Sequence, residues 1–301
     1  MIVYDLKTMA KTEINEKTVV ALGTFDGCHF AHKKVLLESF CEAKKRGVKS
    51  VAYTFSSIPK KAKSIYTLEE KIKAISKTGI DYIAIDDFED ICNYSPKEFF
   101  ENVLVGKLNA VSACCGYNYK FGKGAVANAQ DLSAFFSEID GGSVQICDEI
   151  IINGKSVSST LLRTFIENGE IEALDSFGTK YSIYEKVVEG KRLGNRLGFP
   201  TINQRIPDDK VVPKRGVYIT ECEIGEDVYP AITNVGIRPS IDDGDEINME
   251  TYIIGFHGIL YNSYVKVNFY KYLRAEVRFA SLSELSVQIN KDKKQAENYF
   301  K

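Results

Sequence analysis

The chain contains no tryptophan, only three histidines and seven prolines, and almost no excess of either charge. Its formal net charge of −2 gives no reason to expect a nucleic acid or an anionic membrane as a partner. No apolar run approaches the roughly 18 residues that a membrane span requires. The first residues lack the apolar core and the small-residue cleavage site of a signal peptide, so we expect a cytoplasmic protein.

The seven cysteines form no C-x-x-C pair, and their number is odd. This pattern argues against a zinc ribbon and against a disulfide framework. Most of the cysteines fall inside apolar runs, where a reduced thiol packs as a small hydrophobic group. Tyrosine and phenylalanine, 17 of each, supply the aromatic volume. With 301 residues, the chain is long enough for two domains with separate cores.

Residues 1–180 alternate strand and helix patterns, which predicts an α/β domain with a doubly wound parallel sheet. Ligands of such sheets bind beyond the carboxyl ends of the strands. We expect strands at 18–22, 48–55, 80–85, 109–115 and 143–152, and helices at 32–46, 68–78, from Ser95-Pro96 onward, at 131–139 and within 169–178.

The turn after the first of these strands reads Gly23-Thr24-Phe25-Asp26-Gly27-Cys28-His29-Phe30-Ala31-His32. It leads into a helix, so backbone N–H groups and a helix N-terminus point past the strand end and favour an anion. His29 and His32 could donate hydrogen bonds to phosphate oxygens there. An ordinary strand-to-helix connection that happens to contain histidines is the alternative.

Two further segments of this half carry chemically useful side chains. The loop 116–124, Gly-Tyr-Asn-Tyr-Lys-Phe-Gly-Lys-Gly, is aromatic and cationic and follows a strand end. It could stack on a planar ring, although a plain surface loop would look similar. The hydroxyls of Ser158-Ser159-Thr160 precede Arg163 at a helix start, where capping alone is the simpler interpretation.

From Tyr181 to Lys301 the pattern changes to short strands separated by Gly, Pro, Asn and Asp, which predicts an antiparallel barrel or sandwich. We expect strands at about 181–189, 216–224, 227–234, 248–256 and 263–270, followed by a terminal helix at about 283–300. We therefore place a domain boundary at about residue 180.

The segment 188–203 contains three glycines with basic residues between them and ends in Phe199-Pro200-Thr201-Ile202-Asn203. A flexible basic loop of this kind can wrap a polyphosphate, but a solvated basic hairpin is an equal alternative. It is not a Walker P-loop, because the Gly-Lys-Ser/Thr ending is absent. Thr201 and Asn203 are two residues apart, so their oxygens face the same way on an extended chain and suit Mg²⁺.

The histidine turn, the loop 116–124 and the Ser-Ser-Thr-x-x-Arg segment together resemble a nucleotidyltransferase, and more narrowly the FMN adenylyltransferase module of bacterial riboflavin kinase/FAD synthetases. The resemblance implies that His29, His32 and Arg163 act at the triphosphate of ATP. It implies further ATP contacts from Gly23, Phe25, Asp26, Ser159 and Thr160, and flavin contacts from Asn118, Tyr119 and Phe121.

The second half resembles the riboflavin kinase of the same family through Gly190-x-x-x-Gly194-x-x-x-Gly198-Phe-Pro-Thr-x-Asn and the motifs that follow it. The resemblance implies a six-stranded barrel in which Glu250 is the catalytic base and Thr201 and Asn203 hold Mg²⁺. It also implies ATP contacts from Gly190, Lys191, Gly194, Gly198 and Pro200, and a flavin contact from Arg274. The substrates and products would be ATP, riboflavin, FMN and FAD.

The first half departs from the family pattern, whereas the core kinase motif is intact. Ala31 stands in place of a glycine, Leu161 in place of an arginine, and Asn118 and Lys120 in place of an acidic residue and an arginine, while the usual Pro-His-Pro is absent from 55–59. The residues leave three hypotheses open: a bifunctional FAD-forming enzyme, a working kinase with a degenerate flavin- or nucleotide-binding first domain, and a non-catalytic flavin-binding regulator.

Overall fold

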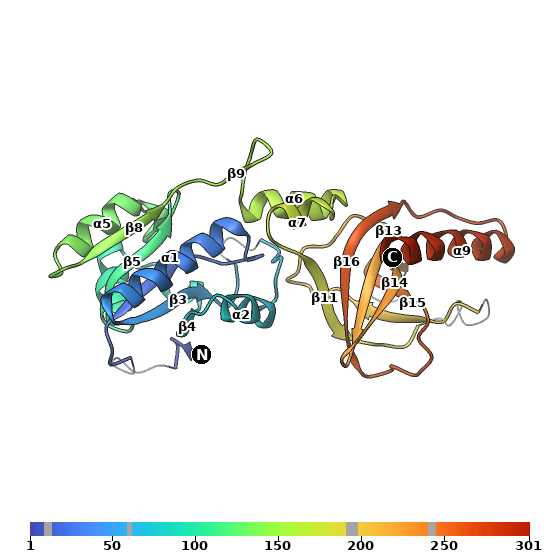
Figure 1. The fold of residues 1–301 in the computed structure, drawn as a ribbon, viewed down its shortest axis with the longest axis horizontal. Helices are drawn as coiled ribbons and strands as arrows, with labels where there is room; N and C mark the ends of the chain where they lie inside the picture. The colour runs from blue at the N-terminus through green and yellow to red at the C-terminus, as the bar shows by residue number, and fades with distance from the viewer. Residues whose placement is uncertain (9–13, 59–61, 191–197, 240–244) are drawn as a thin grey trace. The chain divides into compact units, whose positions relative to one another are not determined.

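The computed structural model describes residues 1–8, 14–58, 62–190, 198–239 and 245–301 (Figure 1). These residues divide into two compact units. The first unit comprises Met1–Leu161 and Phe177–Thr179, and the second comprises Leu162–Ser176 and Lys180–Lys301. The domain boundary near residue 180 stays a prediction, because the chain passes between the units more than once around it.

Strands and helices alternate along much of the chain from the N-terminus to Ser176. They are β1 (Ile2–Asp5), β2 (Thr18–Leu22), α1 (Phe30–Arg46), β3 (Lys49–Phe55), α2 (Leu68–Ser76), β4 (Tyr82–Asp86), α3 (Phe88–Ile91), α4 (Pro96–Glu98), the π-helix η2 (Phe99–Val105), β5 (Ala110–Gly116), β6 (Lys120–Phe121), the 3₁₀ turn η3 (Lys123–Ala125), β7 (Ala127–Asn128), α5 (Ala129–Ser137), β8 (Ser143–Cys147), β9 (Ile151–Ile152), β10 (Lys155–Ser156), α6 (Ser159–Asn168) and α7 (Ala173–Ser176).

The first unit is built on a parallel sheet of order β1-β4-β3-β2-β5-β8, as predicted. Alternate residues of its strands face two cores. Val20 and Leu22 of β2 join the core covered by η2 and α5, while Val19 and Ala21 join the core covered by α1 and α2. The strand order reverses between β2 and β5, which is where doubly wound sheets bind their ligands.

Local signals set several helix ends where the sequence predicts them. Thr67 and Ser95 each form a capping box, with Glu70 and Glu98 respectively. Gly47 ends α1 in the left-handed conformation, with φ of 69°.

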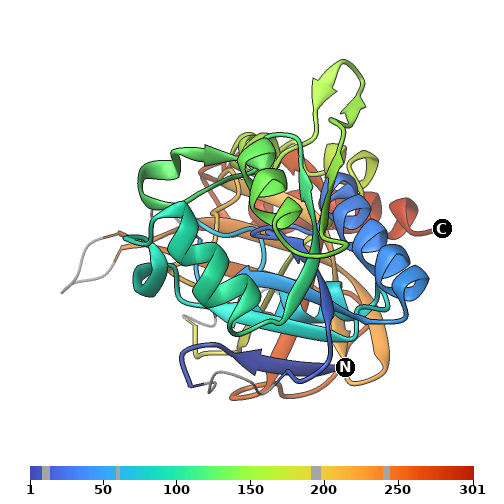
Figure 2. The ribbon, with the colours of Figure 1, turned by 90° about the vertical axis from the view of Figure 1, so that its left-hand side faces the viewer.

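The helix expected within 169–178 is present as α7, but it is short and spans only Ala173–Ser176, because Gly169, with φ of 79°, follows the end of α6 in the left-handed conformation. One expectation for the first half is wrong. The strand expected at 143–152 stops at Cys147, and Ile151–Ile152 instead pairs with Lys155–Ser156. The turn of that hairpin is Asn153-Gly154, both at positive φ, a dipeptide that signals such turns. The hairpin projects from the body of the sheet in Figure 2.

The second unit is an antiparallel sheet of order β11-β16-β13-β14-β15-β12 with a terminal helix. The backbone N–H of Val188 donates to the carbonyl of Asn203 at 2.8 Å, which links the segment after β11 to the far edge strand and curls the sheet toward a barrel. Ala296 of the helix packs on Ile219 and Ile232. The elements are β11 (Tyr181–Lys186), β12 (Thr201–Arg205), β13 (Gly216–Ile224), β14 (Asp227–Pro239), β15 (Asp245–Ile253), β16 (Tyr264–Arg274) and α9 (Leu282–Tyr299).

Candidate functional sites

The turn after β2 has an unusual backbone. Phe25 and Cys28 have φ of 50° and 40° although neither is glycine, and Gly27 between them has φ of 75°. Such conformations persist only where the surroundings hold them. The buried carboxylate of Asp26 accepts hydrogen bonds from the backbone N–H groups of Ile65 and Tyr66, at 2.9 and 3.0 Å. Asp26 therefore fastens the turn to the segment that leads into α2.

The segment 177–179 clamps the same turn from the other side. The carbonyl of Phe177 accepts from the N–H of Phe30 at 3.0 Å, and the carbonyl of Gly178 accepts from Lys33 Nζ at 2.6 Å. The Thr179 hydroxyl donates to the carbonyl of Gly27. These bonds belong to one unit, so the turn is preorganised by chain segments far apart in sequence.

The two histidines lie together at the N-terminus of α1. His29 is the N-cap, and its Nδ1 accepts from the backbone N–H of His32 at 3.3 Å. The two rings stack with centroids 3.7 Å apart. His29 Nε2 lies 3.5 Å from the Ser159 hydroxyl, which donates to the carbonyl of Asp26 at 2.9 Å. Imidazoles, a hydroxyl and a helix N-terminus thus converge, as an anion site requires.

A cavity of about 690 Å³ opens in front of this turn. Of the residues predicted for the first site, Gly23, His29, His32, Asn118, Tyr119, Phe121 and Ser159 line it, and Ala31 lines it too. Phe25, Asp26, Thr160 and Arg163 do not line it, and Arg163 is grouped with the second unit. Contact of any of these residues with ATP or flavin stays a prediction.

The apolar wall of the cavity was not identified from sequence. It is formed by Tyr53, Phe55, Phe88, Ile91 and Phe99, which come from β3, α3 and η2. The sequence signal for it is that Phe55, with Tyr53 two residues before it, lies at the end of the strand predicted at 48–55.

Within that wall, the buried Tyr53 hydroxyl donates to Asp86 Oδ2 at 2.9 Å. Burial raises the pKa of Asp86, and the hydrogen bond from Tyr53 opposes the rise. Because the hydroxyl proton is directed to Asp86, the Tyr53 oxygen keeps acceptor capacity toward other groups.

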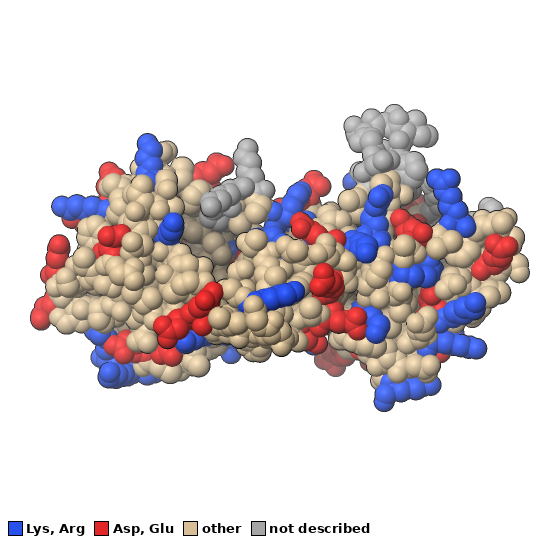
Figure 3. All heavy atoms as spheres, turned by 90° about the horizontal axis from the view of Figure 1, so that it is seen from above, with Lys and Arg blue, Asp and Glu red and all other residues tan. Residues whose placement is uncertain are grey.

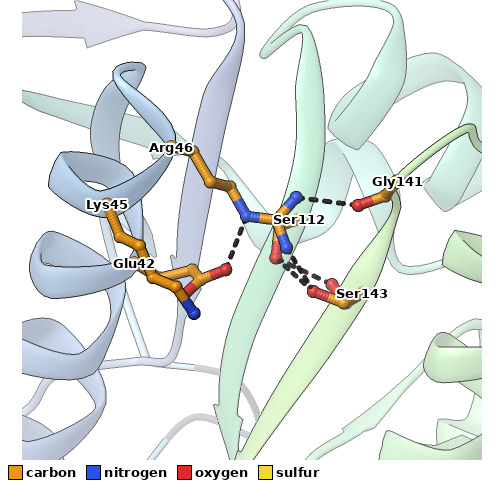
Figure 4. Close-up of polar contacts among 6 residues, drawn as sticks. All are labelled: Glu42, Lys45, Arg46, Ser112, Gly141 and Ser143. Atoms are coloured by element: carbon orange, nitrogen blue, oxygen red, sulfur yellow. Dashed lines mark hydrogen bonds and ion pairs between the residues drawn. The ribbon is translucent and has the colours of Figure 1, made fainter.

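A charged cluster at the end of the sheet opposite the cavity has a structural role. Arg46, the last residue of α1, forms an ion pair with Glu42 and donates to the carbonyl of Gly141 and to the Ser143 hydroxyl, at 2.5, 2.7 and 2.8 Å (Figure 4). These groups lie where β8 begins, whereas the cavity lies where the strands end. Elsewhere, Lys and Arg side chains are interspersed with Asp and Glu on the face seen in Figure 3.

In the second unit, the strand register places the predicted kinase residues on neighbouring strands. Asn203 of β12 is directly opposite Glu250 of β15, and Glu250 is directly opposite Asn234 of β14. Thr201 is one step along the same face, opposite Tyr252. Directly opposite residues hold their Cβ atoms about 5 Å apart, so Glu250 is flanked by two carboxamides.

The ATP contacts expected of the glycines in this unit stay predictions, although Gly190 lies close to a predicted metal ligand. A Cβ built at Gly190 would lie 2.2 Å from Asn203 Nδ2, so only glycine allows this approach. Gly198 has φ of 79°, and both Gly198 and Pro200 are exposed. Lys191 and Gly194 lie outside the described residues.

Arg274 has a strong partner within the second unit. Its guanidinium forms an ion pair with the buried carboxylate of Asp292 on α9, with Nη2 to Oδ2 at 2.8 Å. Gln288 donates to the same carboxylate at 2.8 Å. This contact fastens α9 to the end of β16, and a flavin contact of Arg274 stays a prediction.

The cysteines form no disulfide among the described residues. All seven are free, and five of them are buried, whereas Cys41 is exposed. Burial raises the pKa of the Cys28 thiol to about 11, which keeps it protonated beside the histidine turn.

The described residues contain neither a cluster of metal-ligating side chains nor a helix that could cross a membrane. Among them, no three His, Cys, Asp or Glu side chains are placed to hold a metal ion. No helix in the described part of the chain has the length and apolar character to cross a membrane.

Comparisons with known proteins match each half of the chain separately. The FAD synthetase family model matches residues 11–161, and the riboflavin kinase family model matches residues 177–300. The bifunctional riboflavin kinase/FMN adenylyltransferase of Bacillus subtilis is 31% identical over 96% of this chain and 94% of its own length. The protein of the same name from Listeria monocytogenes is 29% identical over 99% of this chain and 96% of its own length.

A crystal structure from Streptococcus pneumoniae, described as a macrolide-efflux protein, superposes with a TM-score of 0.88. It is 26% identical and covers 99% of both chains. Both family models match in the order that the sequence motifs predict, and the curated relatives align over nearly the whole length. This chain therefore belongs to the bifunctional riboflavin kinase/FMN adenylyltransferase family.

Proposed function

We propose that this chain makes FAD from riboflavin in two ATP-dependent steps, riboflavin phosphorylation in the second unit and FMN adenylylation in the first. The observation that carries the proposal is the pairing of Asn203 with Glu250 across β12 and β15. Residues far apart in sequence, predicted as metal ligand and catalytic base, lie side by side.

In the kinase step, an alcohol must lose its proton to attack phosphorus. The Glu250 carboxylate is exposed on its strand and is suited to accept the proton of the ribityl 5′-hydroxyl. The hydroxyl oxygen bonds to the γ-phosphorus, the bond from that phosphorus to the β-phosphate oxygen breaks, and ADP leaves.

Mg²⁺ fits the donors present near Glu250. The hydroxyl of Thr201 and the amide oxygen of Asn203 are hard oxygen donors on one face, and the carbonyl oxygen of Asn248 is buried there with no hydrogen-bond partner among the described residues. Bound with ATP, the ion would offset charge on the phosphates. An ion that arrives with a nucleotide needs few protein ligands.

The adenylyl step needs no base, because the FMN phosphate is already anionic. One of its oxygens attacks the α-phosphorus of ATP, and pyrophosphate leaves. His29, His32, Ser159 and the N-terminus of α1 would position the triphosphate and stabilise charge there. The aromatic wall of the cavity, with Tyr119 stacked on Phe121 at 5.8 Å, is suited to a planar ring.

Incubation with ATP, Mg²⁺ and riboflavin, followed by chromatography of the flavins, tests the proposal. We expect FMN first and FAD second. Formation of FMN alone would leave only the kinase, with a first unit that binds ligand without transferring adenylyl. Formation of neither would contradict both activities. We also propose that the protein acts in the cytoplasm, where its nucleotide substrates are available.

A further inference from the structure

Asn248 is a feature of the kinase unit that its motifs do not explain. It lies two residues before Glu250 on β15, so the two side chains project from the same face of the sheet. Asparagine is disfavoured in strands, and it is more disfavoured where it is buried. Asn248 is nevertheless buried, with 8% of its surface exposed.

The Asn248 side chain contacts a predicted metal ligand directly. Its Nδ2 donates to Asn203 Oδ1 at 3.2 Å. That oxygen is the atom by which an asparagine ligates a cation, and a carbonyl oxygen has two lone pairs. One lone pair can accept from Asn248 while the other remains for a metal.

The Asn203 amide is also held from its other end. The Gly190 backbone approaches so closely that a Cβ there would lie 2.2 Å from Asn203 Nδ2 and 2.8 Å from Oδ1. Asn203 itself is buried. With Gly190 on one side and the Asn248 donor on the other, the amide has little freedom to rotate.

The carbonyl oxygen of Asn248 takes no part in these contacts. It is buried, and no hydrogen-bond donor reaches it among the described residues. Gln204 Oε1 of β12 is also buried without a partner among the described residues, whereas the hydroxyls of Thr220, Thr233 and Thr251 form a continuous chain of hydrogen bonds at 2.8 and 2.9 Å. A buried acceptor without a donor, beside a predicted metal ligand, indicates that the donor arrives with a ligand.

We propose that Asn248 is a positioning residue for the Mg²⁺–nucleotide of the kinase step. It fixes the direction of Asn203 Oδ1, and its own carbonyl oxygen accepts a hydrogen bond from the water that Mg²⁺ retains when it binds with the nucleotide. The inference rests on the proposed kinase function of the second unit.

The test compares Asn248→Ala with the unmodified full-length chain. Removal of a partner that orients a metal ligand typically weakens metal binding by about 10–100-fold. We expect the Mg²⁺ concentration for half-maximal FMN formation to rise by about this factor, with a much smaller fall in kcat at saturating Mg²⁺. Calorimetry should show weaker binding of ADP with Mg²⁺ and unchanged binding of ADP in a chelator.

Asn268→Ala is the matched control. Asn268 lies on β16 of the same barrel and donates to Glu223 Oε1 at 2.8 Å, so its replacement also removes an amide–side-chain hydrogen bond. It should leave the Mg²⁺ dependence unchanged. Asn248→Ser keeps a hydroxyl at the buried position and serves the same comparison if the alanine variant does not fold.

The possible outcomes distinguish a failure of the proposed role of Asn248 from a failure of the proposed kinase function. If the unmodified chain forms no FMN, the proposed kinase function fails. If it forms FMN, but Asn248→Ala has an unchanged Mg²⁺ dependence or loses ADP binding equally with and without the ion, only the role of Asn248 is overturned.

Discussion

The two units place their chemistry on different parts of their sheets. In the first unit, the candidate residues lie beyond the carboxyl ends of parallel strands, on a turn and a helix N-terminus. In the second, they lie on the face of an antiparallel sheet, fixed by cross-strand register. The nucleophiles differ correspondingly, because a phosphate is already anionic and an alcohol needs a base.

The two sites also differ in how their residues are held in place. The histidine turn has backbone angles that need outside support, and Asp26 and Thr179 provide it. The kinase residues lie on regular strands, whose backbone angles need no such support. Departures from the family pattern, among them Ala31 and Leu161, lie in the first unit. We expect these two departures to alter the rate of the adenylyl step rather than to abolish it.

The largest expected effect is that of Glu250→Gln on the kinase step alone. Loss of a general base should lower FMN formation from riboflavin by about 10²–10⁴-fold. FAD formation from supplied FMN should be unchanged, because it occurs in the other unit. Glu226→Gln, in the exposed turn between β13 and β14, is the control. Equal loss of both reactions would contradict separate sites for the two steps.

His29→Asn should act on the other step. Asparagine preserves the N-cap of α1 but cannot offer a second ring nitrogen to Ser159 or to phosphate. We expect FAD formation from FMN to fall by about 10²-fold, the typical effect of losing one charge-stabilising donor. The kinase rate measured on the same sample is the control, and an equal fall in that rate would contradict separate sites.

Ala31→Gly should have a smaller effect, in the opposite direction. Ala31 lines the cavity, and removing its methyl group would widen the approach to bound nucleotide. We expect the KM for ATP in the adenylyl step to fall a few-fold, while glycine in α1 costs about 0.5–1 kcal/mol of stability. Steady-state kinetics and thermal unfolding measure the two effects. An unchanged KM would show that the methyl group does not crowd the ligand.

Asp86→Asn should produce the smallest change, visible as a trend with pH. Burial raises the pKa of Asp86 in the folded chain, so the folded state holds its proton more tightly than the unfolded state. Stability from this group is fully present below the ordinary aspartate pKa of about 4 and is lost as pH rises through the folded value. The Tm difference should therefore shift in favour of the variant between about pH 4 and pH 7. A shift toward the parent would contradict burial as the dominant cause.

Local signals predicted much of the fold. Periodicity and caps gave β2, α1 and α2 with ends within a few residues, and the change of pattern near Tyr181 marked the antiparallel half. The strand β12 was not expected as a separate strand, because its residues were interpreted only as the end of a basic loop. Its pairing with β15 depends on contacts distant in sequence, which periodicity does not contain.

For the candidate sites too, local sequence predicts some residues and not others. His29, His32 and Ser159 could be predicted because motif spacing carries them, and they converge. Tyr53 with Asp86, and Asn248 with Asn203, could not, because each pair is created by strand register. No spacing rule joins residues on strands whose separation varies with loop length.

On the proposed function, one chain carries two phosphorus-transfer sites that break different bonds of ATP. The most direct test of this claim follows label from ATP into flavins made by the unmodified chain from riboflavin. Label in the γ-phosphoryl group should appear in FMN and then in FAD, while label in the α-phosphoryl group should appear only in FAD. FMN labelled from the γ position with no α label in any flavin, even when FMN is supplied, would contradict the claim for the first unit.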